Sequence, residues 1–319
     1  MLDVTAATEM RAPLFEDVAD APEGGVAAWV ATMDGVTIRV AAWGHGAPKG
    51  TVLIFPGRTE YVEKYGGVAG ELLARGYASA VVDWRGQGIS GRVHRRPAHG
   101  HVAAFRDYQA DVAALLRFVR DEGLPQPLYL LAHSMGGCIG LRALTGDLPV
   151  RAAAFSAPMW GLNLTPSRRG VAWSLSTLSR TVGLSGVLTP GQLPESYILS
   201  VGFEENALTT HRESFQQLVQ QLRAHPELAL GGPTLRWLNE ALREMRGLAA
   251  RPSPRVPVVA FLGTEEAIVD PGRIHRRMAD WPGGRLEMID GARHEVLMEG
   301  PRTRGRILDA AVELFAAHG

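Results

Sequence analysis

The sequence predicts an α/β fold in which helices cover both faces of a mostly parallel sheet. Short apolar runs alternate along the chain with longer segments of helical period, which is the pattern of such a sheet. A chain of 319 residues is long enough for one large domain with an insertion. The composition, 46% hydrophobic and 21% charged, is ordinary for a globular protein.

Strands and helices are expected to alternate along most of the chain. Strands are predicted at 36–43, 51–56, 77–84, 127–133, 151–158, 256–263 and 285–290. Helices are predicted at 61–74, 105–122, 135–144, 273–281 and 304–315. This alternation is typical of parallel strands joined by helical connections.

The alternation stops between about residues 159 and 251. Here VAWSLSTLSRTVGL and SFQQLVQQLRAH have helical period, and Gly and Pro separate the runs. The segment is too long for an ordinary loop. We therefore expect an α/β core formed by residues 1–158 and 252–319. A helical cap, residues 159–251, is expected as an insertion after the sixth strand, over the carboxyl edge of the sheet.

Charge and cysteine content narrow the class of protein. The 33 basic and 33 acidic residues cancel, so bulk charge does not support nucleic-acid binding. The single cysteine, Cys138, cannot form an internal disulfide. The N-terminus lacks the basic segment of a signal peptide, and no apolar run reaches the roughly 18 residues of a membrane span. We expect a cytoplasmic protein and leave open peripheral contact with the inner face of the membrane. The oligomeric state is not indicated.

One predicted strand ends in an unusual way. The run AHSMG, which centres on Ser134, matches a nucleophile elbow, where a strand turns abruptly into a helix and exposes the serine Oγ. Small residues are needed two positions before and after the serine, and Ala132 and Gly136 meet that need. The helix that follows directs its N-terminal N–H groups toward charge that develops beside Ser134. We interpret Ser134 as a nucleophile, although a serine that caps an ordinary turn has the same short pattern.

A serine hydroxyl needs a general base, and the base needs an acid to fix its tautomer. After an elbow of this kind, the acid and then the base follow along the chain. His294 comes directly after the last predicted strand and is the candidate base. Three carboxylates, those of Glu265, Glu266 and Asp270, follow the strand at 256–263. Glu266 is favoured as the acid because it is nearer to the strand, whereas Asp270 before Pro271 also suits a helix N-cap.

An oxyanion intermediate needs two fixed donors. The backbone N–H of Met135, directly after the candidate nucleophile, is one expected donor. The run IFPGRTEY supplies the other, because Gly57 allows a tight turn that presents the backbone N–H of Arg58. Since both donors are backbone groups, this prediction does not depend on the side chains.

Taken together, these segments resemble the α/β-hydrolases of the monoacylglycerol lipase and bacterial lysophospholipase branch. The resemblance covers the chain from about residue 15 to the C-terminus, and the segments that carry it are FPGRTEYVEKY, VVDWRGQGISGR, HVAAFRDYQADVAALL, LYLLAHSMGG, APMWG and GARHEVLMEG. It implies the α/β-hydrolase fold, with Ser134 as nucleophile, Glu266 as acid and His294 as base. It also implies Arg58 and Met135 as oxyanion donors. No metal or organic cofactor is expected.

The expected substrate is a lipid-like small-molecule ester, a lysophospholipid or a monoacylglycerol. Met159 and Trp160 are candidate substrate-binding residues. Together with Leu162, Leu164 and Trp173 they either line a slot for an acyl chain or belong to the core. The basic loop 91–101 either holds a phosphate head group, touches an anionic membrane, or is a solvated surface loop. The alternative functions are a short-chain esterase, a thioesterase, and a silent hydrolase-fold protein that only binds a ligand.

Overall fold

The computed structural model describes residues 10–319, and in that range one nine-stranded sheet has the order β1-β2-β3-β5-β4-β6-β7-β8-β9. The strands are β1 (Met10–Arg11), β2 (Val26–Ala31), β3 (Thr37–Trp43), β4 (Thr51–Phe55), β5 (Ala78–Asp83), β6 (Leu128–His133), β7 (Ala153–Ser156), β8 (Val258–Gly263) and β9 (Arg285–Ile289). Pairing is antiparallel from β1 to β5 and parallel from β5 through β4 to β9. The mostly parallel sheet predicted from the sequence is therefore confirmed.

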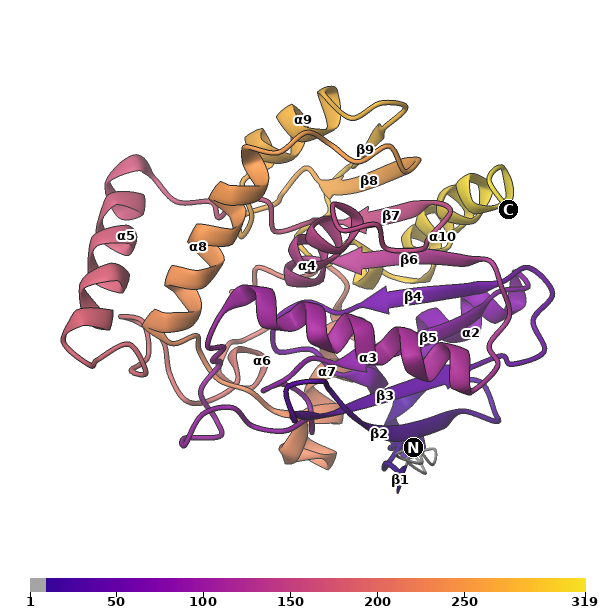
Figure 1. Ribbon diagram of the computed structural model, residues 1–319, viewed down its shortest axis with the longest axis horizontal. Coiled ribbons are helices and arrows are strands. Elements are labelled where there is room, and N and C mark those ends of the chain that lie inside the picture. The colour runs from indigo at the N-terminus through magenta and orange to yellow at the C-terminus, as the bar shows by residue number, and fades with distance from the viewer. Residues whose placement is uncertain (1–9) are drawn as a thin grey trace, which may run out of the picture.

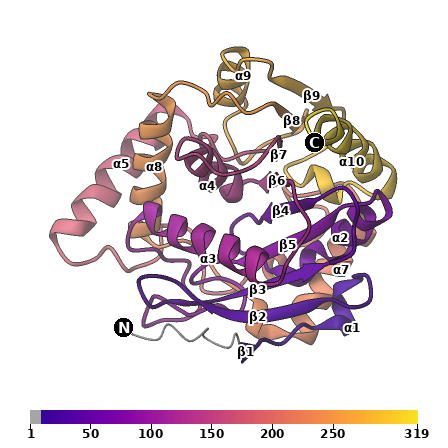
Figure 2. The same cartoon turned by 45° about the vertical axis from the view of Figure 1, so that its right-hand side comes forward.

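Helices cover both faces of this sheet (Figures 1 and 2). Those of the α/β part are α1 (Glu16–Ala19), η1 (Val62–Tyr65), α2 (Gly66–Ala74), η2 (Phe105–Asp107), α3 (Tyr108–Asp121), α4 (Met135–Leu144), α9 (Pro271–Ala279), η4 (Val296–Met298) and α10 (Pro301–Ala316). One core layer lies under α3, α4 and α9, and the other under α2 and α10.

The central strand β4 shows why the buried strands have almost continuously apolar sequences. Neighbouring residues of a strand point to opposite faces. Leu53 and Phe55 face the layer with α3 and α4, whereas Val52 and Ile54 face the layer with α2 and α10. All five residues of β4 are buried, because both faces of the sheet are covered.

The segment between β7 and β8 is helical. It contains α5 (Pro166–Thr181), α6 (Tyr197–Ser200), α7 (Arg212–Ala224), η3 (Pro226–Leu228) and α8 (Leu235–Ala249). Helix α8 packs against α4 and η2, and α7 packs against α1 and η1, so the segment contacts the α/β part at two places. In Figure 1 the arrows of β4 and β6 point toward the side on which α5, α6 and α8 lie.

Two details differ from the sequence prediction. The insertion, predicted after the sixth strand, follows β7, the seventh, because the sheet begins with β1 and β2, which are not among the strands predicted by range. Strand β2 was not predicted, since its Ala-rich run VAAWVA gives a weak β signal. Residues 1–9, which belong to the predicted core unit and to the segment considered as a signal peptide, lie outside the described residues.

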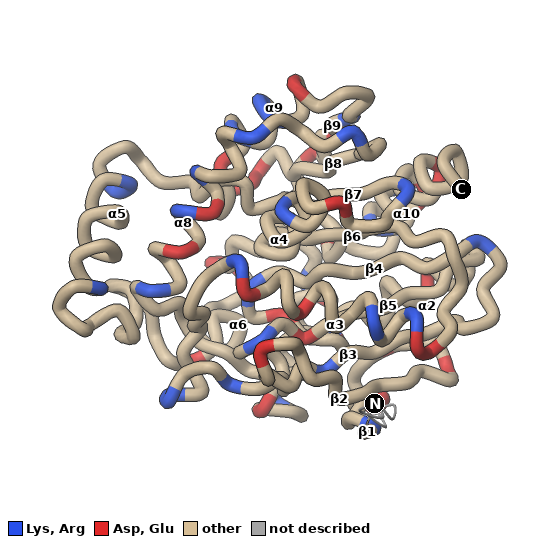
Figure 3. Tube along the Cα trace, viewed as in Figure 1, with Lys and Arg blue, Asp and Glu red and all other residues tan. Residues whose placement is uncertain are grey.

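Acidic and basic residues are interspersed along the whole trace (Figure 3). This distribution agrees with the cancelling charges of the sequence. None of the helices in residues 10–319 combines the length and the apolar character that crossing a bilayer requires.

Candidate active site

Ser134 lies at the turn between β6 and α4 in a strained backbone conformation with a positive φ, which is uncommon for residues other than glycine. Its φ is 48° and its ψ is −115°. The backbone holds this turn, because Ser134 N–H donates to the Ser156 carbonyl over 3.0 Å and the Ser134 carbonyl accepts from Met159 N–H over 2.8 Å. A Cβ at Gly136 would lie 2.0 Å from the Phe55 carbonyl oxygen, so glycine is required where α4 begins beside β4.

His294 and Glu266 extend from neighbouring strand ends toward this serine. His294 Nε2 lies 2.8 Å from Ser134 Oγ, and His294 Nδ1 lies 2.7 Å from Glu266 Oε2. The carboxylate accepts a hydrogen bond from Nδ1–H, which leaves Nε2 free to accept the serine proton. The structure thus brings three of the predicted residues into one hydrogen-bonded chain, and all three are buried.

Glu266 rather than Asp270 contacts His294. Burial would raise the pKa of Glu266, but the hydrogen bond from His294 and those from two backbone N–H groups outweigh burial and lower it. The backbone donors are Ile268 and Val269, at 2.6 and 3.0 Å from Oε1. Asp270 instead caps α9, since its Oδ1 accepts from Arg273 N–H over 3.2 Å.

The expected oxyanion donors belong to the residue after Ser134 and to the loop after β4, which lines the same cavity as Ser134. Among residues 10–319, the backbone N–H groups of Arg58 and Met135 form no hydrogen bond with another residue. The loop that carries Arg58 is held by the Glu60 carboxylate, which accepts the Gly57 N–H. It is also held by the Gln87 side chain, which accepts the N–H of Thr59. Both donors are therefore fixed and available.

A cavity of about 410 Å³ opens beside Ser134 and His294. Its walls come from the loop after β4 and from the helical segment between β7 and β8. Most of the lining is apolar and includes Met159, Leu162, Ile198, Leu208, Leu218, Leu222, Trp237, Leu238, Ile268 and Val269. A pocket of this kind suits a ligand with an apolar chain.

Of the two residues predicted to bind substrate, Met159 lines this cavity and Trp160 does not. The ring of Trp160 instead packs in the core against Phe155 and Trp281, with centroids 5.2 and 6.0 Å away, which is the other role expected for it. Its Nε1–H donates to the Gly137 carbonyl over 3.1 Å. Neighbouring residues on a turn point in different directions, which the sequence pattern alone does not resolve.

Comparisons with known proteins agree with this geometry. The model of the family described as serine aminopeptidase, S33, matches residues 46–301. Lysophospholipase L2 of Escherichia coli (strain K12) is 32% identical over 283 residues, which cover 84% of this chain and 80% of that protein. The chain belongs to this α/β-hydrolase family. Probable lysophospholipase L2 of Haemophilus influenzae is 30% identical and covers 81% of this chain and 80% of its own length.

Solved structures of α/β-hydrolases have the same fold. A soluble variant of monoglyceride lipase from Saccharomyces cerevisiae superposes with a TM-score of 0.70 at 20% identity, over 91% of this chain and 95% of that one. A carboxyl esterase from Bacillus coagulans gives a TM-score of 0.71 at 13% identity, over 93% of this chain and 99% of that one.

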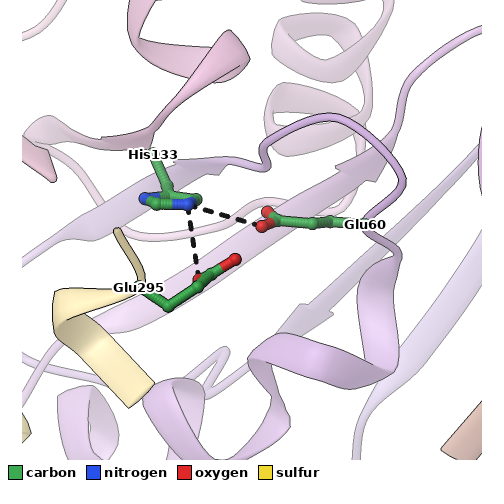
Figure 4. Close-up of side chains that lie close together, drawn as sticks. All are labelled: Glu60, His133 and Glu295. Atoms are coloured by element: carbon green, nitrogen blue, oxygen red, sulfur yellow. Dashed lines mark ion pairs between the residues drawn. The ribbon is translucent and has the colours of Figure 1, made fainter. Parts of the chain in front are cut away.

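Behind the nucleophile lies a buried cluster of charged side chains that the sequence analysis missed. Lys64 Nζ lies 2.6 Å from Glu60 Oε1 and 2.7 Å from Glu295 Oε1. His133 Nε2 lies 3.3 Å from Glu295 Oε2 and 3.5 Å from Glu60 Oε1 (Figure 4). Two of its residues could have been suspected from the sequence, because Glu295 directly follows the candidate base and His133 directly precedes the candidate nucleophile.

The surroundings of His133 in this cluster favour its charged form. Its Nδ1 lies 3.0 Å from the Ser156 carbonyl oxygen, which accepts only a hydrogen bond, so Nδ1 carries a proton. Its Nε2 faces the carboxylates of Glu60 and Glu295, which favour a second proton. Burial alone would lower the pKa of His133, but these carboxylates outweigh it and raise the pKa.

The two carboxylates and His133 also lie close enough to share a metal ion. However, the Lys64 ammonium already lies between one oxygen of Glu60 and one of Glu295. A divalent cation would have to displace this buried ammonium. We therefore assign the cluster to Lys64 and His133 rather than to a metal.

None of the residues of the basic loop 91–101 lines the cavity beside Ser134, although the end of the loop bonds to Gly231 and Gly232 near Arg58. Arg92 holds the turn before the loop, where it donates to the Gly86 and Gly88 carbonyls over 2.7 Å each. Arg95 and Arg96 are exposed. The arrangement favours the solvated surface loop among the predicted alternatives.

Proposed function

We propose that this protein is a serine hydrolase that cleaves the carboxylic ester of a lipid-like substrate through an acyl-enzyme. The observation that carries the proposal is the chain of hydrogen bonds from Glu266 through His294 to Ser134, at 2.7 and 2.8 Å, beside an apolar cavity. A site that only bound a ligand would not need an acid, a base and a hydroxyl hydrogen-bonded in this order.

In the proposed reaction, Ser134 Oγ attacks the ester carbonyl carbon while His294 Nε2 takes the hydroxyl proton. The negative charge on the carbonyl oxygen is stabilised by the backbone N–H groups of Arg58 and Met135. The carbon–oxygen bond to the alcohol then breaks, and His294 gives its proton to the leaving oxygen. Water repeats the attack on the acyl-enzyme with His294 again as the base, and the fatty acid leaves. Glu266 fixes the tautomer of His294 and stabilises its charged form.

The proposed substrates are lysophospholipids or monoacylglycerols. The proteins named lysophospholipase L2 share about a third of their sequence with this chain, and the fold is that of a monoglyceride lipase. The apolar cavity has the character that an acyl chain requires. A short-chain esterase or a thioesterase would use the same residues, so the acyl length and the ester type must be measured.

We also propose that the outer face of α5 rests on a lipid surface. Val171, Leu175 and Leu178 follow helical spacing, and their side chains are 64%, 37% and 61% exposed. Tyr197 of α6 is exposed as well and also lines the cavity beside Ser134. A lipid surface against these residues would bring acyl chains near the cavity.

The experiment compares wild type with Ser134→Ala on three matched substrates: a lysophosphatidylcholine, a monoacylglycerol and a short p-nitrophenyl ester. Hydrolysis of the long-chain esters that is lost in Ser134→Ala supports the proposal. Preference for the short ester would make the protein a general esterase. Absence of hydrolysis by wild type, together with failure to react with a fluorophosphonate, would indicate a silent binding protein.

A further inference from the structure

Arg58 brings a positive charge to the cavity beside Ser134. Its side chain borders the cavity, where Nη1 donates to the Gly231 carbonyl over 2.9 Å and the guanidinium carbon lies 5.8 Å from the centre of the Trp237 ring. A guanidinium has five N–H donors. Among residues 10–319, the Gly231 carbonyl is the acceptor it reaches, and no carboxylate lies within ion-pair distance. Most of its donors are therefore available to a ligand.

Burial lowers the pKa of Arg58 to about 10, so the side chain stays charged near neutral pH. Arg58 is half-buried. A charge held partly away from water without a counter-ion is costly, which favours binding of an ion of opposite sign. An anionic group in the cavity would supply the missing partner.

The two carboxylates that border the cavity do not serve as this partner. Glu60 is engaged by the Lys64 ammonium and by the Tyr65 hydroxyl, each at 2.6 Å. Glu295 is engaged by Lys64 at 2.7 Å and by His133 at 3.3 Å. Lys64 and His133 therefore balance the negative charges of these two carboxylates. The positive charge of Arg58 is left without a counter-ion in the cavity wall.

We propose that the Arg58 side chain binds the phosphodiester of a lysophospholipid and thereby selects this class over neutral monoacylglycerols. The inference rests on the proposed function and specifies its substrate. In a lysophospholipid, the three glycerol carbons and one oxygen separate the scissile ester oxygen from the phosphorus. Arg58 combines a backbone N–H that faces the ester carbonyl with a long side chain in the same cavity. A planar guanidinium also matches two phosphate oxygens, which strengthens the contact.

The same charge disfavours a peptide substrate with a free amino terminus. An aminopeptidase must accommodate an α-ammonium group near the scissile bond. In this cavity that group would meet Arg58 instead of a free carboxylate. The uncompensated charge therefore favours an anionic substrate.

The test compares 1-oleoyl-lysophosphatidylcholine with 1-oleoylglycerol, which share an acyl chain, in the same mixed micelles. For wild type, Arg58→Gln and Arg58→Lys, we measure kcat/KM on both esters and take the ratio. We expect Arg58→Gln to lower the ratio of lysophospholipid to monoacylglycerol about tenfold or more, because a hydrogen-bonded charge pair is lost. Arg58→Lys keeps the charge but not the paired donors, so it should lower the ratio less. The matched control is Arg96→Gln, which removes an exposed charge of loop 91–101 and should leave the ratio unchanged.

A loss of structure, or of the hydrogen bond from Arg58 to the Gly231 carbonyl, would reduce hydrolysis of both esters together. It would not change the ratio of their kcat/KM values. An unchanged ratio in Arg58→Gln and Arg58→Lys, with wild type active on both esters, would overturn this inference and leave the proposed function intact. If Arg58→Gln does not fold, the ratio for Arg58→Lys decides. A wild type inactive on both esters would instead overturn the proposed function, and this inference with it.

Discussion

Lys64 and Glu295 are 231 positions apart in the sequence, yet Lys64 Nζ lies 2.7 Å from Glu295 Oε1 in the buried cluster behind Ser134. Lys64 belongs to η1, which follows the loop with Arg58, and Glu295 directly follows His294. The pair therefore joins the loop of one proposed oxyanion donor to the loop of the proposed base. Both side chains are almost fully buried, with 3% and 7% exposed.

Removal of the Lys64 charge should destabilise the fold and slow turnover. Lys64→Met leaves Glu60 and Glu295 without their shared cation, and breaking a buried pair costs about 3–5 kcal/mol. We expect a loss of this size in the free energy of unfolding, measured by urea denaturation. The control is Lys49→Met at the other lysine of the chain, which is exposed. Equal stability of the two variants would contradict the role assigned to Lys64.

The acid is tested by two isosteric substitutions. Glu266→Gln keeps the shape but leaves His294 without the charge that stabilises its protonated form, so kcat should fall by about three to four orders of magnitude. Asp270→Asn weakens the pair with Arg169, which lies 3.2 Å away, and should change kcat only a few-fold. Steady-state hydrolysis of one ester by both variants makes the comparison. The opposite order of losses would assign the acid to Asp270.

The charged state of His133 should make stability depend on pH. Its folded-state pKa is raised above the ordinary 6.5. Its contribution is therefore fully present below 6.5 and is lost as pH rises through the folded-state pKa. The groups that face its ring are Glu60, Glu295, Lys64 and His294.

We compare the free energy of unfolding of wild type and His133→Asn between about pH 6 and about pH 9. The advantage of wild type should shrink as the pH rises. A difference that stays constant over this range would show that folding does not raise the pKa of His133.

The outer face of α5 is tested with vesicles. The double variant Val171→Ser and Leu178→Ser removes two exposed apolar side chains, and its partition onto anionic phospholipid vesicles should fall about tenfold or more. Cosedimentation measures the partition. Met33→Ser, at an exposed apolar residue of the turn between β2 and β3, is the control. Equal binding by all three proteins would argue against a lipid surface on α5.

Sequence patterns were sufficient for the seven strands from β3 to β9 and for the three residues that form the hydrogen-bonded chain. Buried parallel strands produce apolar runs, and the tips of such strands must hold the polar residues at one edge. Ser134, Glu266 and His294 each follow a predicted strand, so their positions could be derived before their distances were known.

The sequence could not reveal the buried cluster in the same way. Glu60 and Lys64 are four residues apart, a spacing that usually indicates a solvated helical pair. Burial of this pair depends on β6 and on the loop after β9, which lie far away in the sequence. The direction of Trp160 and the availability of the Arg58 side chain likewise depend on contacts between distant segments.

Covalent labelling is the most direct test of whether Ser134 is the nucleophile. The folded wild type is treated with a fluorophosphonate, digested and mapped by mass spectrometry, with heat-denatured protein and Ser134→Ala as controls. We expect one adduct, on the peptide with Ser134, in the folded wild type and in neither control. An adduct on another residue, or ester hydrolysis that survives in Ser134→Ala, would contradict this expectation.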